Sequence, residues 1–418
     1  MKFKVERIIQ SKLFRNMNWL IFQNIYSMIL SVVITAISAR YLGPSNYGLL
    51  GYGASLVSIF ASASTLGLDT ILVYEIVVNE KKKGEIIGTA LIMKLVASII
   101  SIFMILLFTF LLEPQNKVLL VVTFLQSLAL IFQTYMLLSE WFVAELKSKY
   151  FVLGSIVGLT LGGGWKVLLL FMGSGVEWFA LATSIEAIAC GITVFCIFKR
   201  KKNFALSYSF PTVKMLLKKG GSYIIANIAI MIYMQTDKIM IEKMLGEYDV
   251  GIYTAAVNIA NMWIFIPMAI VNSLRPVILK KWNEDYRKSM KMLWKLLGGI
   301  IALCFMACVV LCLFSGIIVH VLYGKTYLEA VEMINVLTWS VLFAMIGVVG
   351  SIWLIAENKD KYSTYRTIVG AVINVIFNYY AINKYGAMGA AYGTLVSQFV
   401  VAVVAPLFWK NSLRCKER

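Results

Sequence analysis

Apolar stretches of about 20 residues recur along the whole 418-residue chain. A helix of that length crosses the roughly 30 Å hydrocarbon core of a bilayer. Of all residues, 60% are hydrophobic and only 14% are charged, whereas about 25% are charged in a soluble domain. The sequence therefore predicts an all-α, polytopic membrane protein without a large soluble domain.

Twelve apolar segments can be drawn, at about 17–39, 46–68, 86–112, 117–139, 150–171, 178–198, 220–240, 251–274, 293–315, 328–356, 363–382 and 387–409. Cytoplasmic loops of membrane proteins are enriched in Lys and Arg, so these residues test the count. Of the 39, 31 lie on the side of the N-terminus, six on the opposite side, and Lys94 and Lys166 inside spans. The split predicts twelve transmembrane helices with both termini cytoplasmic. It also accounts for the net charge of +18 without a nucleic-acid partner.

An internal repeat divides the chain into two halves. The pattern Leu-Gly-four residues-Gly-aliphatic occurs at 42–49 and again at 245–252, 203 positions later. It predicts a six-helix lobe at 1–200, a cytoplasmic amphipathic linker at 201–219 and a second six-helix lobe at 220–418. Two repeats of equal orientation are typical of alternating-access transporters, with the substrate between the lobes.

Several motifs resemble a known family when they are taken in order along the chain. They are Tyr41-Leu42-Gly43-Pro44, Thr236-Asp237-Lys238, Val250-Gly251-Ile252-Tyr253, Asn374-Val375-Ile376-Phe377-Asn378 and the stretch from Tyr385 to Thr394. Together they resemble the O-antigen and capsule oligosaccharide-lipid flippases of the multidrug/oligosaccharidyl-lipid/polysaccharide exporter superfamily. The resemblance implies two six-helix lobes around a central cavity. It also implies transport of undecaprenyl-diphosphate-linked repeat units to the outer leaflet of a bacterial cytoplasmic (inner) membrane.

The resemblance further implies a set of partners. These are the lipid-linked oligosaccharide, membrane lipid, and the polysaccharide polymerase with its chain-length machinery. Charged residues within hydrocarbon are costly and usually line a cavity, so Lys94 and Lys166 are candidates for binding an anionic diphosphate. The alternatives are snorkelling, or pairing with Glu140 or Glu186, and these two carboxylates are themselves gate or coupling candidates.

Amide side chains supply further candidates for the substrate cavity. Asn258, Asn261 and Asn272 fall within about 60° of one another on an ideal helix. Asn227 and Gln235 form a looser stripe on the preceding span. These amides can bind sugar hydroxyls or bond neighbouring helices.

Three charged residues lie near the ends of these two spans. Arg275 is either a membrane-edge anchor or a ligand contact. Asp237 and Lys238 form either a gate or coupling pair, or a capped helix end.

Two other classes of protein remain as alternatives. The first is a multidrug or cation antiporter of the same superfamily, although the first span contains no Asp or Glu. The second is a polysaccharide polymerase, although the longest outer loop, at 316–327, is short for such an enzyme. The chain contains no His-Glu-x-x-His or Cys-x-x-Cys motif. We therefore expect a transporter rather than an enzyme, with no cofactor and no metal.

Overall fold

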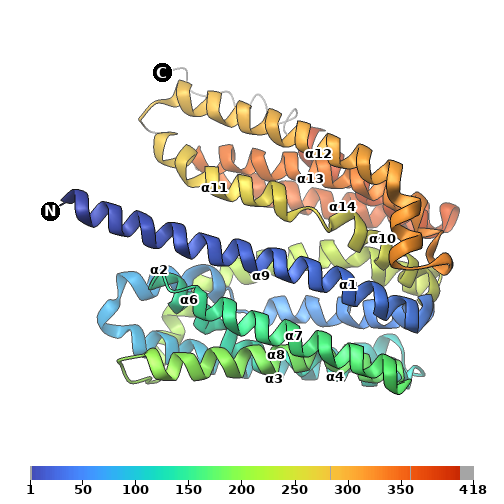
Figure 1. Ribbon diagram of the computed structural model, residues 1–418, viewed down its shortest axis with the longest axis horizontal. Coiled ribbons are helices and arrows are strands. Elements are labelled where there is room, and N and C mark those ends of the chain that lie inside the picture. Colours follow the sequence, from blue (N-terminus) through green and yellow to red (C-terminus); the bar gives the residue numbers. More distant parts are fainter. Residues whose placement is uncertain (1, 283, 358, 405–418) are drawn as a thin grey trace. The chain divides into compact units, whose positions relative to one another are not determined.

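The computed structural model describes residues 2–282, 284–357 and 359–404 (Figure 1). These residues form helices joined by short turns, and none of them lies in a strand. Within the described ranges, nine helical segments are long and apolar enough to cross a membrane. The all-α, polytopic fold predicted from the sequence is therefore confirmed.

Three further spans complete the expected twelve. The segment Asn18–Val78 holds two spans, because Gly43 has a non-helical backbone and separates them. The helices Glu247–Asn261 and Phe265–Trp282, bent by 47°, together form another. The last is Asp360–Tyr385, a 26-residue helix. The predicted count of twelve transmembrane helices is confirmed.

The described residues divide into two compact units. The first contains residues up to Leu42 and from Leu49 to Met231, and the second contains Gly43–Gly48 and the chain from Ile232 onward. The division falls inside one continuous helix, Phe210–Met244, which contains both the second half of the predicted linker and the seventh predicted span.

The first unit is built from the N-terminal helices. They are α1 (Lys2–Ser64, shared with the second unit), α2 (Leu68–Val78), η1 (Glu80–Lys82), α3 (Lys83–Leu112), α4 (Lys117–Ser127), α5 (Ala129–Gln133), η2 (Thr134–Leu137), α6 (Leu138–Ala144), α7 (Lys149–Met172), α8 (Val176–Lys201) and the first part of α9 (Phe210–Met244). A core around Trp141, Phe142 and Phe198 joins α2, α3, α6 and α8. The fourth predicted span is thus a succession of short helices from α4 to α6.

The second unit is built from the C-terminal helices. They are the end of α9, α10 (Glu247–Asn261), α11 (Phe265–Trp282), α12 (Tyr286–Leu322), η3 (Lys325–Tyr327), α13 (Ala330–Ala356), α14 (Asp360–Tyr385), α15 (Ala387–Phe399) and η4 (Val400–Val404). Its core packs α11, α12 and α13 around Ile300, Met345 and Trp282.

The segment predicted as a linker packs against the first unit. The Ser209 backbone N–H donates to Thr89 Oγ1 over 3.1 Å, and Thr212 donates to Glu85. Farther along α9, the Lys219 ammonium group lies 2.6 Å from the Glu75 carboxylate, which is 1% exposed. These contacts tie the start of α9 to α2 and α3.

The repeated Leu-Gly motif has the same backbone shape in both copies. Gly43 has φ 71° and ψ 170°, and Gly246 has φ 102° and ψ −179°. This combination is essentially restricted to glycine, since a side chain would clash. Each of these glycines therefore permits a sharp turn immediately before a helix begins.

The second glycine of each motif makes a close contact within the second unit. A methyl group added to Gly48 would lie 2.8 Å from the Gly251 backbone N, and one added to Gly251 would lie 3.1 Å from the Gly48 backbone N. Gly48 and Gly251, which occupy the same position in the two copies of the motif, thus contact each other. The contact needs glycine on both sides because the backbones themselves touch.

Candidate functional site

The carboxylate of Asp237, near the end of α9, lies at the centre of a polar network within the second unit. Tyr253 Oη (α10) and Thr394 Oγ1 (α15) donate to Asp237 Oδ2 over 2.6 Å and 2.5 Å. Asn378 Nδ2 (α14) donates to Asp237 Oδ1 over 2.6 Å. The side chain is 7% exposed. No ion pair among the described residues includes Asp237, so neutral donors from three helices hold this carboxylate.

The network extends from Asp237 along α14. Asn378 Nδ2 also lies 3.3 Å from Asn374 Oδ1, and both asparagines are buried. Gly393 allows this approach, since any side chain there would collide with the Asn378 amide. Tyr253, Asn374, Asn378 and Thr394 all lie in the motifs that carry the family resemblance. The order of these motifs along the chain is therefore the sequence feature that could have identified the network. The sequence analysis named only Asp237 and Lys238 as site candidates.

Other polar residues of α9 lie around this network. Lys238 is partly exposed, and its electrostatic partner is Asp237. Gln235 has a buried side-chain oxygen without a hydrogen-bond partner among the described residues. Asn227 is partly exposed on the part of α9 that belongs to the first unit.

Asn258 contacts the first copy of the Leu-Gly motif. Its Nδ2 donates to Tyr47 Oη over 2.8 Å. The Tyr47 ring lies 6.4 Å and 6.2 Å from the rings of Tyr323 and Tyr327, centroid to centroid. All these residues belong to the second unit. The Asn258 amide is therefore engaged within the protein, although the residue remains exposed.

The other candidates from the eighth predicted span are exposed, but they do not lie on one straight helix. Asn261 ends α10, whereas Asn272 and Arg275 lie on α11. Extrapolating one helical face from 258 to 272 is therefore wrong. The 47° bend between the two helices is explained by Pro267 at the start of α11, because it cannot donate a backbone hydrogen bond.

The two lysines inside the N-terminal spans both have carboxylate partners. Lys94 Nζ (α3) lies 3.3 Å from Asp69 Oδ1 at the start of α2, and Glu140 (α6) interacts electrostatically with both. Lys94 is 7% exposed. Pairing with a carboxylate, one of the alternatives to diphosphate binding, is therefore present in the structure. The nearest counter-charge is Asp69, which the sequence did not single out.

Lys166 lies on α7 and has Glu186, on the neighbouring helix α8, as its electrostatic partner. Both side chains are partly exposed. Gly158 and Gly162 bring the two helices together, because a methyl group on either would lie within 3.0 Å of α8 atoms. Small residues at such spacing are typical of close helix packing in membranes. A cation and a carboxylate are thus held near each other inside the first unit.

The cysteines of α12 lie in the core of the second unit. Cys304 and Cys308 are buried, and the Cys308 thiol lies 3.3 Å from the Thr338 carbonyl oxygen. Within the described ranges, no group of three or more His, Cys, Asp or Glu side chains is arranged to hold a metal ion.

The fold is that of a multi-span membrane transporter. It is similar to a multidrug-resistance MATE transporter of the MOP superfamily solved in an inward-facing conformation, with a TM-score of 0.76, 16% identity and coverage of 92% of this chain and 94% of that one. It is also similar to the lipid II flippase MurJ, with a TM-score of 0.72, 15% identity and coverage of 95% and 87%.

The family follows from the sequence match. The family model described as "Polysaccharide biosynthesis protein" matches residues 13–282, which is more than half of the chain, so the protein belongs to this family. A second model, MatE, matches residues 223–380. A Shigella flexneri protein named "Putative O-antigen transporter" is 21% identical over 96% of this chain and 98% of its own length. The Staphylococcus aureus capsular polysaccharide biosynthesis protein CapF is 27% identical over 42% of this chain and 44% of its own length.

Proposed function

We propose that this protein is a flippase that moves lipid-linked oligosaccharide repeat units across the membrane for polysaccharide biosynthesis. The observation that carries the proposal is the end-to-end similarity to a protein named as an O-antigen transporter, on a transporter fold. The carrier lipid is undecaprenyl diphosphate, and the product serves O-antigen or capsule assembly. Movement follows alternating access between two lobes around a central cavity.

Substrate binding in this proposal uses cations and amides. Lys94 and Lys166 attract the diphosphate as point charges, and each lies near a carboxylate partner when the site is empty. Amides and one guanidinium group bind sugar hydroxyls as the repeat unit passes. These groups belong to Asn227, Gln235, Asn258, Asn261, Asn272 and Arg275.

Asp237 is the proposed coupling residue. The Asp237 carboxylate is hydrogen-bonded only by neutral donors, and no described cation lies within ion-pair distance of it, although the neighbouring Lys238 interacts with it electrostatically. Binding a proton or a cation there would remove that charge and change the contacts among four helices. Lys238, Glu140 and Glu186 are secondary gate or coupling candidates.

The proposed setting is a bacterial inner membrane with both termini in the cytoplasm. The 31 cations on the side of the N-terminus support this orientation. The lipid-linked product would then be presented to the polysaccharide polymerase and its chain-length machinery on the outer face.

Complementation tests this function. The gene is expressed in a bacterium that lacks its own O-antigen flippase, and surface polysaccharide is measured by immunoblot and by binding of labelled antibody to intact cells. We expect restored display together with disappearance of the accumulated lipid-linked repeat unit. Persistent accumulation across several repeat-unit types, at normal protein level, would contradict the proposal.

Export of cationic drugs is the second candidate. It is favoured by the MatE match to residues 223–380 and by the similarity to a multidrug transporter. Expression in a strain without drug efflux pumps distinguishes the two. Raised drug resistance without restored polysaccharide display would favour the antiporter.

A further inference from the structure

One side of helix α14 carries a broad apolar face that remains exposed. Val372, Ile376, Tyr379 and Tyr380 are 52%, 55%, 57% and 70% exposed. The opposite side of the helix carries the buried residues Asn374 and Asn378. An exposed apolar face on a membrane-spanning helix is chemically suited to contact with lipid hydrocarbon.

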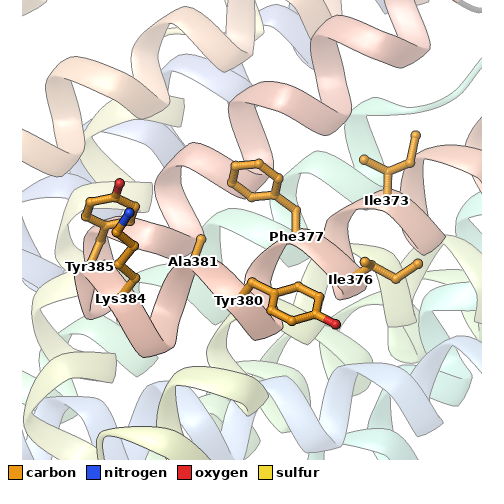
Figure 2. A pocket seen from close by; sticks show the side chains of 7 residues that line it. All are labelled: Ile373, Ile376, Phe377, Tyr380, Ala381, Lys384 and Tyr385. Carbon is orange, nitrogen blue, oxygen red and sulfur yellow. The ribbon is translucent and has the colours of Figure 1, made fainter.

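A trough of about 370 Å³ runs along the edge of this face, shares Ile376 and Tyr380 with it, and is lined only by residues of α14 (Figure 2). The small side chain of Ala381 forms the floor, and Phe377 and Tyr380 stand on either side. Ile373 lies at one end and Lys384 with Tyr385 at the other (Figure 2). Apart from the Tyr380 hydroxyl, the trough is therefore apolar along its length, and its charged group lies at one end.

The polar end carries a positive charge that forms no ion pair with the described part of the chain. Lys384 is exposed, and none of the ion pairs among the described residues includes it. Its Nζ lies 5.2 Å from the centre of the Tyr385 ring. Lys384 follows the predicted span 363–382 by two residues, which is the depth at which lysine and tyrosine meet lipid headgroups.

The dimensions of the trough match one lipid chain in one leaflet. From Ile373 to Tyr385 a helix rises about 18 Å, and half of a bilayer's hydrocarbon core is about 15 Å. We propose that this trough binds one acyl chain of an anionic phospholipid, with the lipid phosphate at Lys384. The site is separate from the Asp237 network and does not depend on the proposed flippase activity.

The charge at Lys384 defines which headgroup binds. Phosphatidylglycerol carries a net negative charge, whereas the ammonium group of phosphatidylethanolamine cancels its phosphate. A lysine near a membrane surface favours an anionic lipid by roughly fivefold. A polyprenyl chain is branched and longer than one leaflet, so the straight acyl chain fits this short trough better.

Native mass spectrometry of the full-length protein tests the site. The protein is titrated with phosphatidylglycerol or phosphatidylethanolamine of identical acyl chains, and retained lipid is counted. Two variants remove parts of the site, Lys384→Gln and Tyr380→Ala. Each has a matched control: Lys325→Gln is an exposed lysine elsewhere in the second unit, and Tyr379→Ala is an exposed tyrosine beside the trough. Thermal unfolding checks that all four variants are folded.

The expected result is a roughly fivefold preference for phosphatidylglycerol that is lost in Lys384→Gln and weakened in Tyr380→Ala, with both controls like the parent. A photoreactive phosphatidylglycerol should label peptides that contain residues 373–385. Equal retention of the two lipids, or equal effects in variants and controls, would overturn the proposal. Displacement of the lipid by equimolar undecaprenyl phosphate would assign the trough to the carrier lipid instead.

Discussion

At the residue scale, Asp237 brings together side chains that lie up to 157 positions apart in the sequence. A buried carboxylate is costly unless hydrogen bonds replace its lost hydration, and here Tyr253, Asn378 and Thr394 supply them. Charge-assisted hydrogen bonds of this kind are stronger than neutral ones. The charge of Asp237 therefore organises the place where α9, α10, α14 and α15 meet.

Replacing Asp237 by asparagine should strongly reduce transport without unfolding the protein. The asparagine amide has the same shape as the carboxylate but carries no charge. Its N–H₂ group is a donor and would face the groups that now donate to Asp237. We expect surface polysaccharide to fall at least tenfold, a change of about 1.4 kcal/mol, at near-normal protein level. Asp285→Asn is the matched control, because Asp285 only caps α12 at an exposed turn. Wild-type display by Asp237→Asn would remove this residue from the mechanism.

Variants of the Lys94–Asp69 pair distinguish two roles for Lys94, which are binding of the substrate diphosphate and neutralisation of Asp69. If Lys94 binds the diphosphate, Lys94→Ala should reduce polysaccharide display roughly tenfold, the value of one charged hydrogen bond, and Lys94→Arg should keep part of it. The double variant Lys94→Ala with Asp69→Asn should stay impaired. Lys166→Ala is expected to behave like Lys94→Ala.

Recovery of display in the double variant would instead mean that Lys94 serves only to neutralise Asp69. Protein level in the membrane is measured for each variant, since a packing defect would mimic lost transport.

Residue chemistry was only partly predictable from the sequence. The motif identifies Asp237, but its partners lie on three other helices. The spacing of residues along one helix does not show which side chains of other helices lie close to it. Asp69 was missed because it falls one residue beyond the span drawn at 46–68. In the structure, Gly67 (φ 67°) turns the chain there and α2 continues the membrane segment.

At the element scale, hydropathy located the spans well but did not reveal their interruptions. A mean over 20 residues does not distinguish one straight helix from two bent ones, so the break before Pro267 was not seen. The sequence also predicts an interruption that the structure does not show. The polar composition of 201–219 indicates a separate linker, whereas its second half is continuous with span seven in α9. Charge patterns mark the membrane surface, but helix ends depend on local hydrogen bonds.

The glycine contact between the two motif copies makes a prediction at this scale. Gly251→Ala should destabilise the protein by about 1–3 kcal/mol, the usual effect of overpacking, because its methyl group would meet the Pro44 carbonyl oxygen. Gly299→Ala is the control, since a methyl group there meets no atom within 4 Å. Thermal unfolding in detergent measures both. Similar melting temperatures for the two variants would show that the backbones do not touch.

At the scale of the whole molecule, topology follows from charge. The 31 to 6 distribution of cations predicts that a reporter that matures only in the cytoplasm is active when fused after Arg418 and inactive when inserted beside Lys325. Arg418 itself lies outside the residues that the structure describes. Activity in the reverse pattern would invert the orientation, and activity at both sites would change the number of crossings.

The most direct test of the flippase proposal is translocation by the purified protein. Proteoliposomes receive a fluorescent lipid-linked oligosaccharide, and dithionite, which does not cross the bilayer, quenches the outer leaflet only. We predict that the wild-type protein exposes inner-leaflet lipid to quenching, and that Asp237→Asn slows this exposure at least tenfold, in line with its expected effect in cells. The proposed function would be contradicted if quenching with the wild-type protein stopped at the outer leaflet for every repeat unit supplied, under a gradient of protons or of another cation.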